Sequence, residues 1–216
     1  RNLLIAIEEY GNIDKFVNVG SYLEKPFEFD NKDLKLNKQF DLYGLSKFYQ
    51  TKLIEYYSVE RKIPAVTLRL YNPYGQFEDS SRLVSHIMVS LVLKKSLKIN
   101  SGSARHNFIY IKDVVNALKQ APKWPNKNGG IIDIRTAIKT SVKEVVELAC
   151  ELANSKLKIQ WDGDKISAPK KNDAKETVAG HFDEKLNWKP EVSLEKGLQE
   201  TFNWYKKNIS FYKNIK

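Results

Sequence analysis

Two short, mostly apolar segments on either side of one long helical pattern constrain the fold of this chain more than any other feature. Phe16 to Val19 and Val66 to Leu70 each have the pattern of a buried strand. Between them, apolar side chains recur at helical spacing from Tyr43 to about Arg61. Strands that are apolar on both faces are typical of a parallel sheet with helices on either side. The sequence therefore predicts an α/β fold with a doubly wound parallel sheet.

The rest of the chain contains further segments with helical or strand periodicity. Gly11 ends an amino-terminal helical pattern, and Ser141 with Glu144 matches a capping box that opens a later helix. Two segments without a period, from Glu24 to Asp41 and from Pro122 to Gly130, are expected to be loops. We expect helices near 3–10, 82–94, 113–119, 141–154, 182–186 and 194–206, and strands near 97–99, 108–111, 131–135 and 157–161.

Length, charge and cysteine content limit the classes of protein that fit. With 216 residues the chain can form one domain, or one domain with a small lobe. Cys150 is the single cysteine, which excludes an internal disulfide and fits a reducing compartment. No segment is apolar enough to span a bilayer, and the net charge of +10 comes from scattered lysines rather than a basic block. We therefore expect a cytoplasmic protein with no membrane partner, no nucleic-acid partner and no metal site.

Tyr43 and Lys47 lie four residues apart at the start of the long helical pattern, so they share one face of the helix. An ammonium beside a phenol stabilises the phenolate, which turns a tyrosine into a usable general acid/base. The same spacing occurs by chance in many helices. The pair therefore indicates catalysis only in combination with other features.

Polar side chains follow both predicted strands. Ser21 ends the first, and Tyr71 and Asn72 come directly after the second. Open α/β sheets place their ligands at the carboxyl ends of their strands. Ser21 could instead cap a turn, and Asn72 before Pro73 is also a good start for a turn. Both interpretations are open at this level.

Several collinear segments resemble the extended short-chain dehydrogenase/reductase family, which contains the NAD-dependent epimerases, dehydratases and reductases of nucleotide sugars. The resemblance runs from about Leu3 to Trp204. The segments that carry it are the strand ending in Ser21, the pair Tyr43-x-x-x-Lys47, the motif Arg69-x-x-Asn72-Pro73-Tyr74-Gly75, the segment Phe108 to Val115 and the segment Leu186 to Pro190.

This resemblance implies a role for each polar residue. Tyr43 would exchange a proton with a sugar hydroxyl or ketone, while a nicotinamide takes or gives hydride at the same carbon. Lys47 would bind the nicotinamide ribose, and Tyr71 would pack near the nicotinamide. Ser21 would hydrogen-bond the reacting oxygen, and Asn72 would bind the diphosphate of a nucleotide-diphosphate sugar. The implied cofactor is NAD or NADP.

For one implied substrate contact, two neighbouring residues fit the family pattern. The family arginine that clamps the diphosphate corresponds by residue type to Arg105, whose planar guanidinium suits phosphate oxygens. Counting back from Phe108, however, puts His106 in that place. Lys170 or Lys171 would stand for a second arginine near the phosphates.

The residues after Ser21 narrow the implied reaction. Family 4,6-dehydratases carry an Asp-Glu pair directly after the serine or threonine for water elimination, and here Tyr22 and Leu23 stand there instead. Epimerisation at C4 and reduction of a 4-keto sugar need only Ser21, Tyr43 and Lys47, and both stay open. An alternative from another class is a truncated, inactive family remnant that binds a nucleotide sugar or serves as an assembly subunit.

The Gly-rich dinucleotide turn of the family does not occur among the ten glycines. The chain starts with Arg1 and enters the family pattern at the helix before the Ser21 strand, so we expect it to lack the first half of a Rossmann domain. Residues 1–75, with 107–135, would form the second half of that domain. Residues 76–106 and 136–216 would mostly form a small α/β substrate-binding lobe.

The Tyr43–Arg61 helix is also a candidate interface. Its residues Tyr49, Leu53, Tyr56 and Tyr57 leave it apolar over more than one face. Members of the family that the sequence resembles commonly dimerise through this helix. We therefore expect a homodimer.

Overall fold

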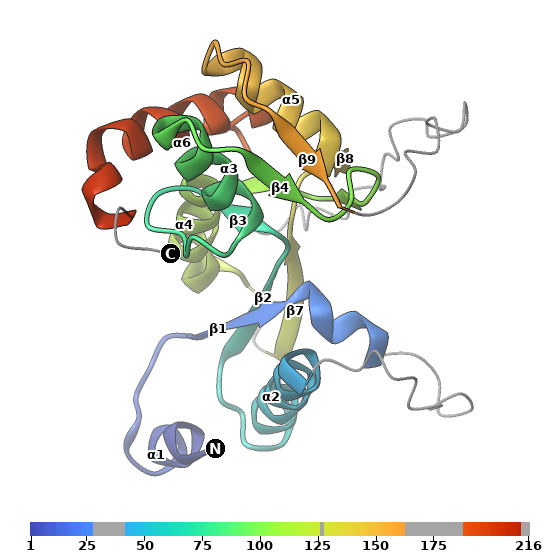
Figure 1. Ribbon diagram of the computed structural model, residues 1–216. Coiled ribbons are helices and arrows are strands. Elements are labelled where there is room, and N and C mark those ends of the chain that lie inside the picture. Colours follow the sequence, from blue (N-terminus) through green and yellow to red (C-terminus); the bar gives the residue numbers. More distant parts are fainter. Residues whose placement is uncertain (28–41, 126–127, 163–187, 213–216) are drawn as a thin grey trace. The chain divides into compact units, whose positions relative to one another are not determined.

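The computed structural model describes residues 1–27, 42–125, 128–162 and 188–212. The chain divides into two compact units (Figure 1). Unit 1 comprises Arg1–Tyr71, Val114–Ile134 and His181–Lys189, and unit 2 comprises Asn72–Asp113, Arg135–Gly180 and Pro190–Lys216. The expected helix near 182–186 and the residues Lys170 and Lys171 lie outside the described residues.

A three-stranded parallel sheet is the centre of unit 1. Its strands are β1 (Phe16–Ser21), β2 (Ala65–Leu70) and β7 (Asn128–Ile134), in the order β1-β2-β7. The central strand β2 is buried along all but its last residue. This sheet confirms the predicted α/β class, because a strand flanked on both sides and covered on both faces needs apolar side chains throughout.

Helix α2 (Leu42–Glu60) connects β1 to β2 and lies against the sheet (Figure 1). Its buried residues recur at helical spacing and so form one face: Gly44, Thr51, Ile54 and Ser58. Ile54 packs with Leu4 of helix α1 (Asn2–Tyr10) in a small apolar cluster. After β1 the chain forms a 3-10 helix, η1 (Tyr22–Phe27).

Strand β7 begins earlier than predicted. Asn128, Gly129 and Gly130 belong to the strand rather than to the preceding loop, with a register shift beside Ala65 and Val66. Gly129 has φ +69°, and a Cβ there would lie 2.9 Å from the Cα of Glu55 in α2. The glycines therefore allow this end of the strand to pass close to a helix. Their composition alone predicts a loop at these positions.

Over the residues that the structure describes, unit 2 consists of short strand pairs and helices around a second apolar core. Strand β3 (Pro73–Tyr74) pairs parallel with β6 (Ile109–Tyr110), β4 (Leu97–Ile99) pairs parallel with β9 (Ile159–Trp161), and β5 (Arg105–His106) pairs antiparallel with β8 (Thr140–Ser141). The helices are α3 (Leu83–Leu93), α5 (Val142–Leu152) and α6 (Leu194–Asn208), followed by η4 (Ile209–Tyr212). The most deeply buried core residues are Ile87, Met88, Leu97, Val145, Val146, Leu198 and Tyr205.

The predicted capping box at the start of α5 is confirmed. The Ser141 hydroxyl accepts a hydrogen bond from the Glu144 N–H at 3.1 Å, and the Glu144 carboxylate accepts one from the Ser141 N–H at 2.7 Å. Helix α4 (Ile111–Gln120) has its first three residues in unit 2 and the remainder in unit 1. No helix in the described part of the chain has the length and apolar character needed to cross a membrane.

Candidate active site

Ser21 is the last residue of β1 and is buried. Its N–H donates to the Glu24 carboxylate at 2.5 Å, and its Oγ accepts from the Leu23 N–H at 3.3 Å. The hydroxyl proton is not used in either contact. Ser21 therefore lies at the carboxyl edge of the sheet, where the sequence placed it, in a turn that fixes its backbone.

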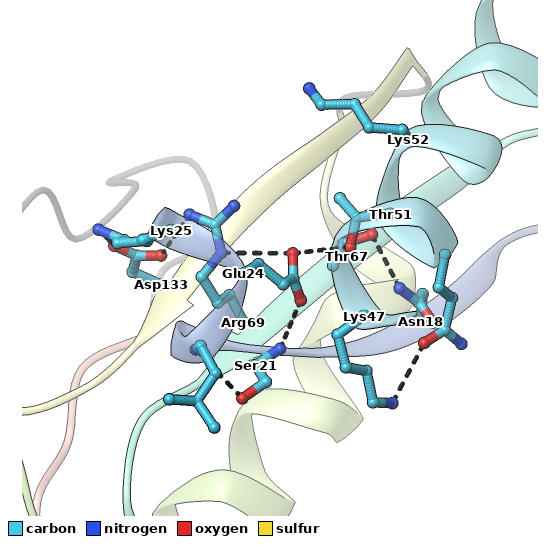
Figure 2. A network of polar contacts seen from close by, with 12 residues as sticks. Asn18, Ser21, Glu24, Lys25, Lys47, Thr51, Lys52, Thr67, Arg69 and Asp133 are labelled. Carbon is cyan, nitrogen blue, oxygen red and sulfur yellow. Dashed lines mark hydrogen bonds and ion pairs between the residues drawn. The ribbon is translucent and has the colours of Figure 1, made fainter. Parts of the chain in front are cut away.

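Tyr43 and Lys47 lie on adjacent turns of α2, as their spacing predicted. The Lys47 Nζ is 5.9 Å from the centroid of the Tyr43 ring, and Tyr43 is half exposed. The same Nζ donates to the backbone oxygen of Val19 at 3.0 Å and to Gln50 Oε1 at 3.1 Å. Because Val19 precedes Ser21 by two residues, Lys47 lies against the strand that carries Ser21 (Figure 2). The catalytic roles of the three residues stay predictions.

Tyr71 follows β2 and closes the same edge of unit 1. Its ring stacks on Tyr22 with the centroids 5.4 Å apart, and its hydroxyl donates to Asp133 Oδ2 at 3.0 Å. Burial raises the pKa of Tyr71, although the nearby Lys25 acts in the opposite direction. Tyr71 is therefore a neutral hydrogen-bond donor over the pH range in which enzymes work.

A network of charged side chains surrounds this edge of the sheet (Figure 2). Arg69 on the buried strand β2 lies 3.6 Å from the Glu24 carboxylate and 3.4 Å from the Asp133 carboxylate. Lys25 pairs with Asp133 at 2.8 Å. Burial acts to lower the pKa of Lys25, but Asp133 and Tyr71 outweigh it and the pKa is raised. The four side chains carry two positive and two negative charges, so the network is balanced.

The sequence does not predict this network, because Glu24 lies in a segment whose pattern predicts a loop. The structure corrects that: Glu24 lies in η1 and is completely buried. A signal was present, since Arg69 is a charged residue in a strand whose other residues are uncharged, and a buried charge needs a partner. Its partners come from segments far apart in the sequence, which periodicity alone cannot identify.

Unit 2 contains a hollow of about 140 Å³ next to β3. Its polar lining consists of Asn72, Glu78, Arg82 and His106. Burial raises the pKa of Glu78 to about 7, with Arg82 acting against the shift. Burial, and then the charge of Lys139, lower the pKa of His106. This hollow therefore gains negative charge as the pH rises through neutrality.

Arg105 does not line this hollow. Its Nη2 donates to the backbone oxygen of Lys139 at 2.8 Å, and its Nη1 lies 3.4 Å from Glu144 Oε2. The neighbouring His106 lines the hollow with Asn72. Arg105 and His106 are successive residues of β5, whose side chains point to opposite faces. The structure therefore favours His106 over Arg105 as a residue available to a ligand there.

Comparison with known proteins places this arrangement in a family. The family model described as NAD dependent epimerase/dehydratase matches residues 1–134. The chain belongs to this family. A human dTDP-D-glucose 4,6-dehydratase is 26% identical over 99% of this chain and 63% of its own length. A CDP-abequose synthase of Yersinia pseudotuberculosis is 27% identical over 73% of this chain and 56% of its own length.

Solved structures of the NAD-dependent epimerase/dehydratase family share the fold. A UDP-N-acetylglucosamine 4-epimerase from Methanobrevibacter ruminantium superposes with a TM-score of 0.77 at 18% identity, covering 96% of this chain and 67% of that one. The chain spans 63% and 61% of the human and mouse dehydratases that it matches. These relatives are enzymes that differ in their reactions, so the family itself leaves the reaction of this chain open.

Among the described residues, no group of three or more His, Cys, Asp or Glu side chains is placed to hold a metal ion. The polar atoms at the edge of unit 1 are instead hydroxyls, amines and paired carboxylates. The hydroxyls and amines donate hydrogen bonds, and the carboxylates accept them.

Proposed function

We propose that the protein is an NAD(P)-dependent nucleotide-sugar epimerase or 4-keto-sugar reductase. The observation that carries this proposal is the position of Lys47, whose ammonium lies beside the Tyr43 ring and against β1 close to Ser21. Chance helical spacing would give the Tyr/Lys contact, but not the contact with the strand that ends in Ser21. Membership of the NAD-dependent epimerase/dehydratase family supports the same chemistry.

Each of these residues would perform one task. The Tyr43 hydroxyl would give a proton to, or take one from, the oxygen at C4 of the sugar. Lys47 would stabilise the phenolate form and bind a ribose hydroxyl, and the Ser21 hydroxyl would donate a hydrogen bond to the reacting oxygen. The nicotinamide, when bound, supplies or accepts the hydride at the same carbon.

The described residues fit only one end of a dinucleotide. Lys47, half-exposed Tyr43 and buried Ser21 offer an ammonium and two hydroxyls beside the carboxyl edge of the sheet. These donors suit the ribose and the reacting sugar oxygen rather than a pyrophosphate. The choice between NAD and NADP therefore stays open.

The contacts of Glu24 argue against a dehydratase. Water elimination needs a carboxyl group that reaches the sugar, and Glu24 is the nearest carboxylate after Ser21 in the sequence. It is completely buried and bound to Ser21, Thr51 and Arg69. Tyr22, in the place of a dehydratase acid, stacks on Tyr71. Epimerisation or reduction needs neither group.

We propose the hollow of unit 2 as the site for the diphosphate of the nucleotide sugar. Asn72 can donate through its amide, and Arg82 and His106 can donate through charged or neutral nitrogens. Pro73, Tyr74, Leu83, Val84 and Phe108 also line the hollow. Of the two residues that the sequence left open for the diphosphate contact, Arg105 and His106, we assign this contact to His106.

A substrate panel tests the proposed reaction. The native enzyme, produced from its complete gene, would be incubated with UDP-glucose, UDP-N-acetylglucosamine or dTDP-glucose and NAD⁺. In parallel it would be incubated with dTDP- or CDP-4-keto-6-deoxyglucose and NADPH. We expect one arm to give a C4-inverted or C4-reduced sugar. Binding of a nucleotide sugar by calorimetry without conversion in either arm would reject the enzyme and favour the inactive-remnant alternative.

The ionisation of Glu78 gives a pH prediction. As the pH rises through about 7, the pKa of Glu78, its carboxylate becomes charged and repels a diphosphate in the same hollow. We expect the KM for the nucleotide sugar to rise about threefold to tenfold between pH 6 and pH 8.5. In Glu78→Gln this rise should largely disappear. An identical KM profile in Glu78→Gln and wild type would contradict the assignment of the hollow.

We also propose a homodimer through the Tyr43–Arg61 helix, in a cytoplasmic protein. Tyr49 and Tyr56 are among the large apolar residues that α2 leaves exposed, at 64% and 51%. Replacing both by glutamate should convert the native protein to monomers in sedimentation velocity at micromolar concentration. Phe77→Glu, at an exposed aromatic of unit 2, is the matched control and should leave the dimer intact. A monomeric wild type would refute the dimer.

A further inference from the structure

The carboxylate of Glu24 contacts three partners at the edge of unit 1. It accepts the Ser21 N–H at 2.5 Å through Oε1 and the Thr51 hydroxyl at 2.8 Å through Oε2, and it pairs with Arg69 at 3.6 Å. The side chain is completely buried (Figure 2). One carboxylate thus joins the end of β1, the middle of α2 and the central strand.

The sheet makes room for this group. Gly20, Arg69 and Asp133 are register neighbours across β1, β2 and β7. A Cβ at Gly20 would collide with the Glu24 carboxylate and with the Thr67 methyl group. Because Gly20 has no side chain, the Glu24 carboxylate can occupy the space above Gly20, next to Arg69.

Thr51 connects this carboxylate to the helix of the proposed catalytic pair. It is buried, lies one turn after Lys47 and about two turns after Tyr43 on α2. Residues at this spacing share a face of the helix. The Lys47–Val19 contact thus fixes this face of α2 to β1, and the Thr51–Glu24 contact fixes it to η1, which follows β1 directly.

We propose that Glu24 is a positioning residue. It holds the turn after Ser21 in a fixed position relative to the face of α2 that carries Tyr43 and Lys47. The proposal rests on the function proposed above. It does not require Glu24 to touch the substrate. Arg69 balances the charge of Glu24, so Glu24 fixes the geometry without adding a net charge to this edge of the sheet.

Removal of the carboxylate should therefore change the chemical step more than binding. Without it, the Ser21 N–H and the Thr51 hydroxyl lose their acceptor, and the turn is free to shift. Displacements of about 1 Å at a reacting group can cost on the order of 10²-fold in rate. We expect Glu24→Ala to lower kcat between about 10- and 100-fold, with KM for the nucleotide sugar within about twofold of wild type.

A mutant cycle with Ser21 separates positioning from a general loss of stability. If Glu24 acts through Ser21, the Glu24→Ala change should lower kcat little further in a Ser21→Ala background. Glu24→Gln keeps an acceptor for the Ser21 N–H and should restore most of the kcat lost in Glu24→Ala. Thr51→Val is a milder variant, expected to lower kcat about threefold to tenfold and to add nothing to Glu24→Ala.

The cycle is measured as kcat and KM on the substrate identified by the panel, with thermal unfolding of each variant. The proposal would be overturned if Glu24→Ala lowered kcat by the same factor in the wild-type and Ser21→Ala backgrounds. A folded Thr51→Val with wild-type kcat would also overturn it, which keeps the test decisive if Glu24→Ala does not fold. Failure of the proposed function is a different result: Ser21→Ala and Tyr43→Phe would then both retain wild-type turnover.

Discussion

Tyr43→Phe in the native enzyme is expected to lower kcat by about 10²–10⁴-fold, the range attributed to general acid/base catalysis. The change removes the hydroxyl that would carry the proton and leaves the ring beside Lys47. Tyr43 is half exposed in the first turn of α2, so the fold should survive. The measurement is the steady-state rate on the converted nucleotide sugar, with circular dichroism as the check on folding.

Tyr49→Phe provides a matched control for this variant. Tyr49 lies on the same helix and is exposed, but the proposal gives its hydroxyl no part in the reaction. We expect its kcat to stay within about twofold of wild type, because exposed substitutions away from a site change little. A Tyr43→Phe enzyme that retained more than about one tenth of wild-type kcat would reject the role of Tyr43 as proton carrier.

Arg69→Met is expected to have the largest effect on stability. The guanidinium lies between the carboxylates of Glu24 and Asp133, and Glu24 has no exposed surface. Removing one partner of a buried pair leaves an uncompensated charge and costs about 3–5 kcal/mol. We therefore expect the free energy of unfolding, from urea denaturation at neutral pH, to fall by this amount.

Arg61→Met is the control for the loss of a guanidinium in general. Arg61 pairs with Glu8 at 3.5 Å, but the Arg61 side chain is 52% exposed. Surface pairs contribute about 0–1 kcal/mol, so this variant should be close to wild type. Equal losses in the two variants would show that the network around Arg69 is not a buried, coupled group. Combining Arg69→Met with Glu24→Gln should recover part of the loss, because the buried negative charge is removed as well.

The main elements of unit 1 could be predicted from local sequence. Continuous apolar runs predict strands of a parallel sheet, and the structure has them as β1 and β2 on either side of α2. Positions that depend on contacts between distant segments could not be predicted. Glu24 was assigned to a loop because its polar neighbours have no period, and Gly129 because glycine is common in turns. The position of Glu24 depends on its contact with Arg69, and that of Gly129 depends on the close approach of α2.

In the candidate site, too, some features follow from local sequence and others depend on contacts between distant segments. The contact between Tyr43 and Lys47 follows from helical spacing alone, and the structure has it. The choice between Arg105 and His106 depended on a register that differed by one residue. Since successive residues of a strand point to opposite faces, that single step exchanges the residue that lines the hollow. No local pattern could decide it.

The most direct test of the central claim follows a deuterium label through the reaction of the native enzyme. The label is placed on C4 of the sugar when NAD⁺ is the cofactor, or on C4 of the nicotinamide when NADPH reduces a 4-keto sugar. We predict a product that carries the deuterium on C4 of its sugar, by NMR and mass spectrometry, and we expect Tyr43→Phe to form this product at least about 100-fold more slowly. A product that has lost the label to water, or equal labelled product from Tyr43→Phe, would contradict hydride transfer coupled to proton transfer by Tyr43.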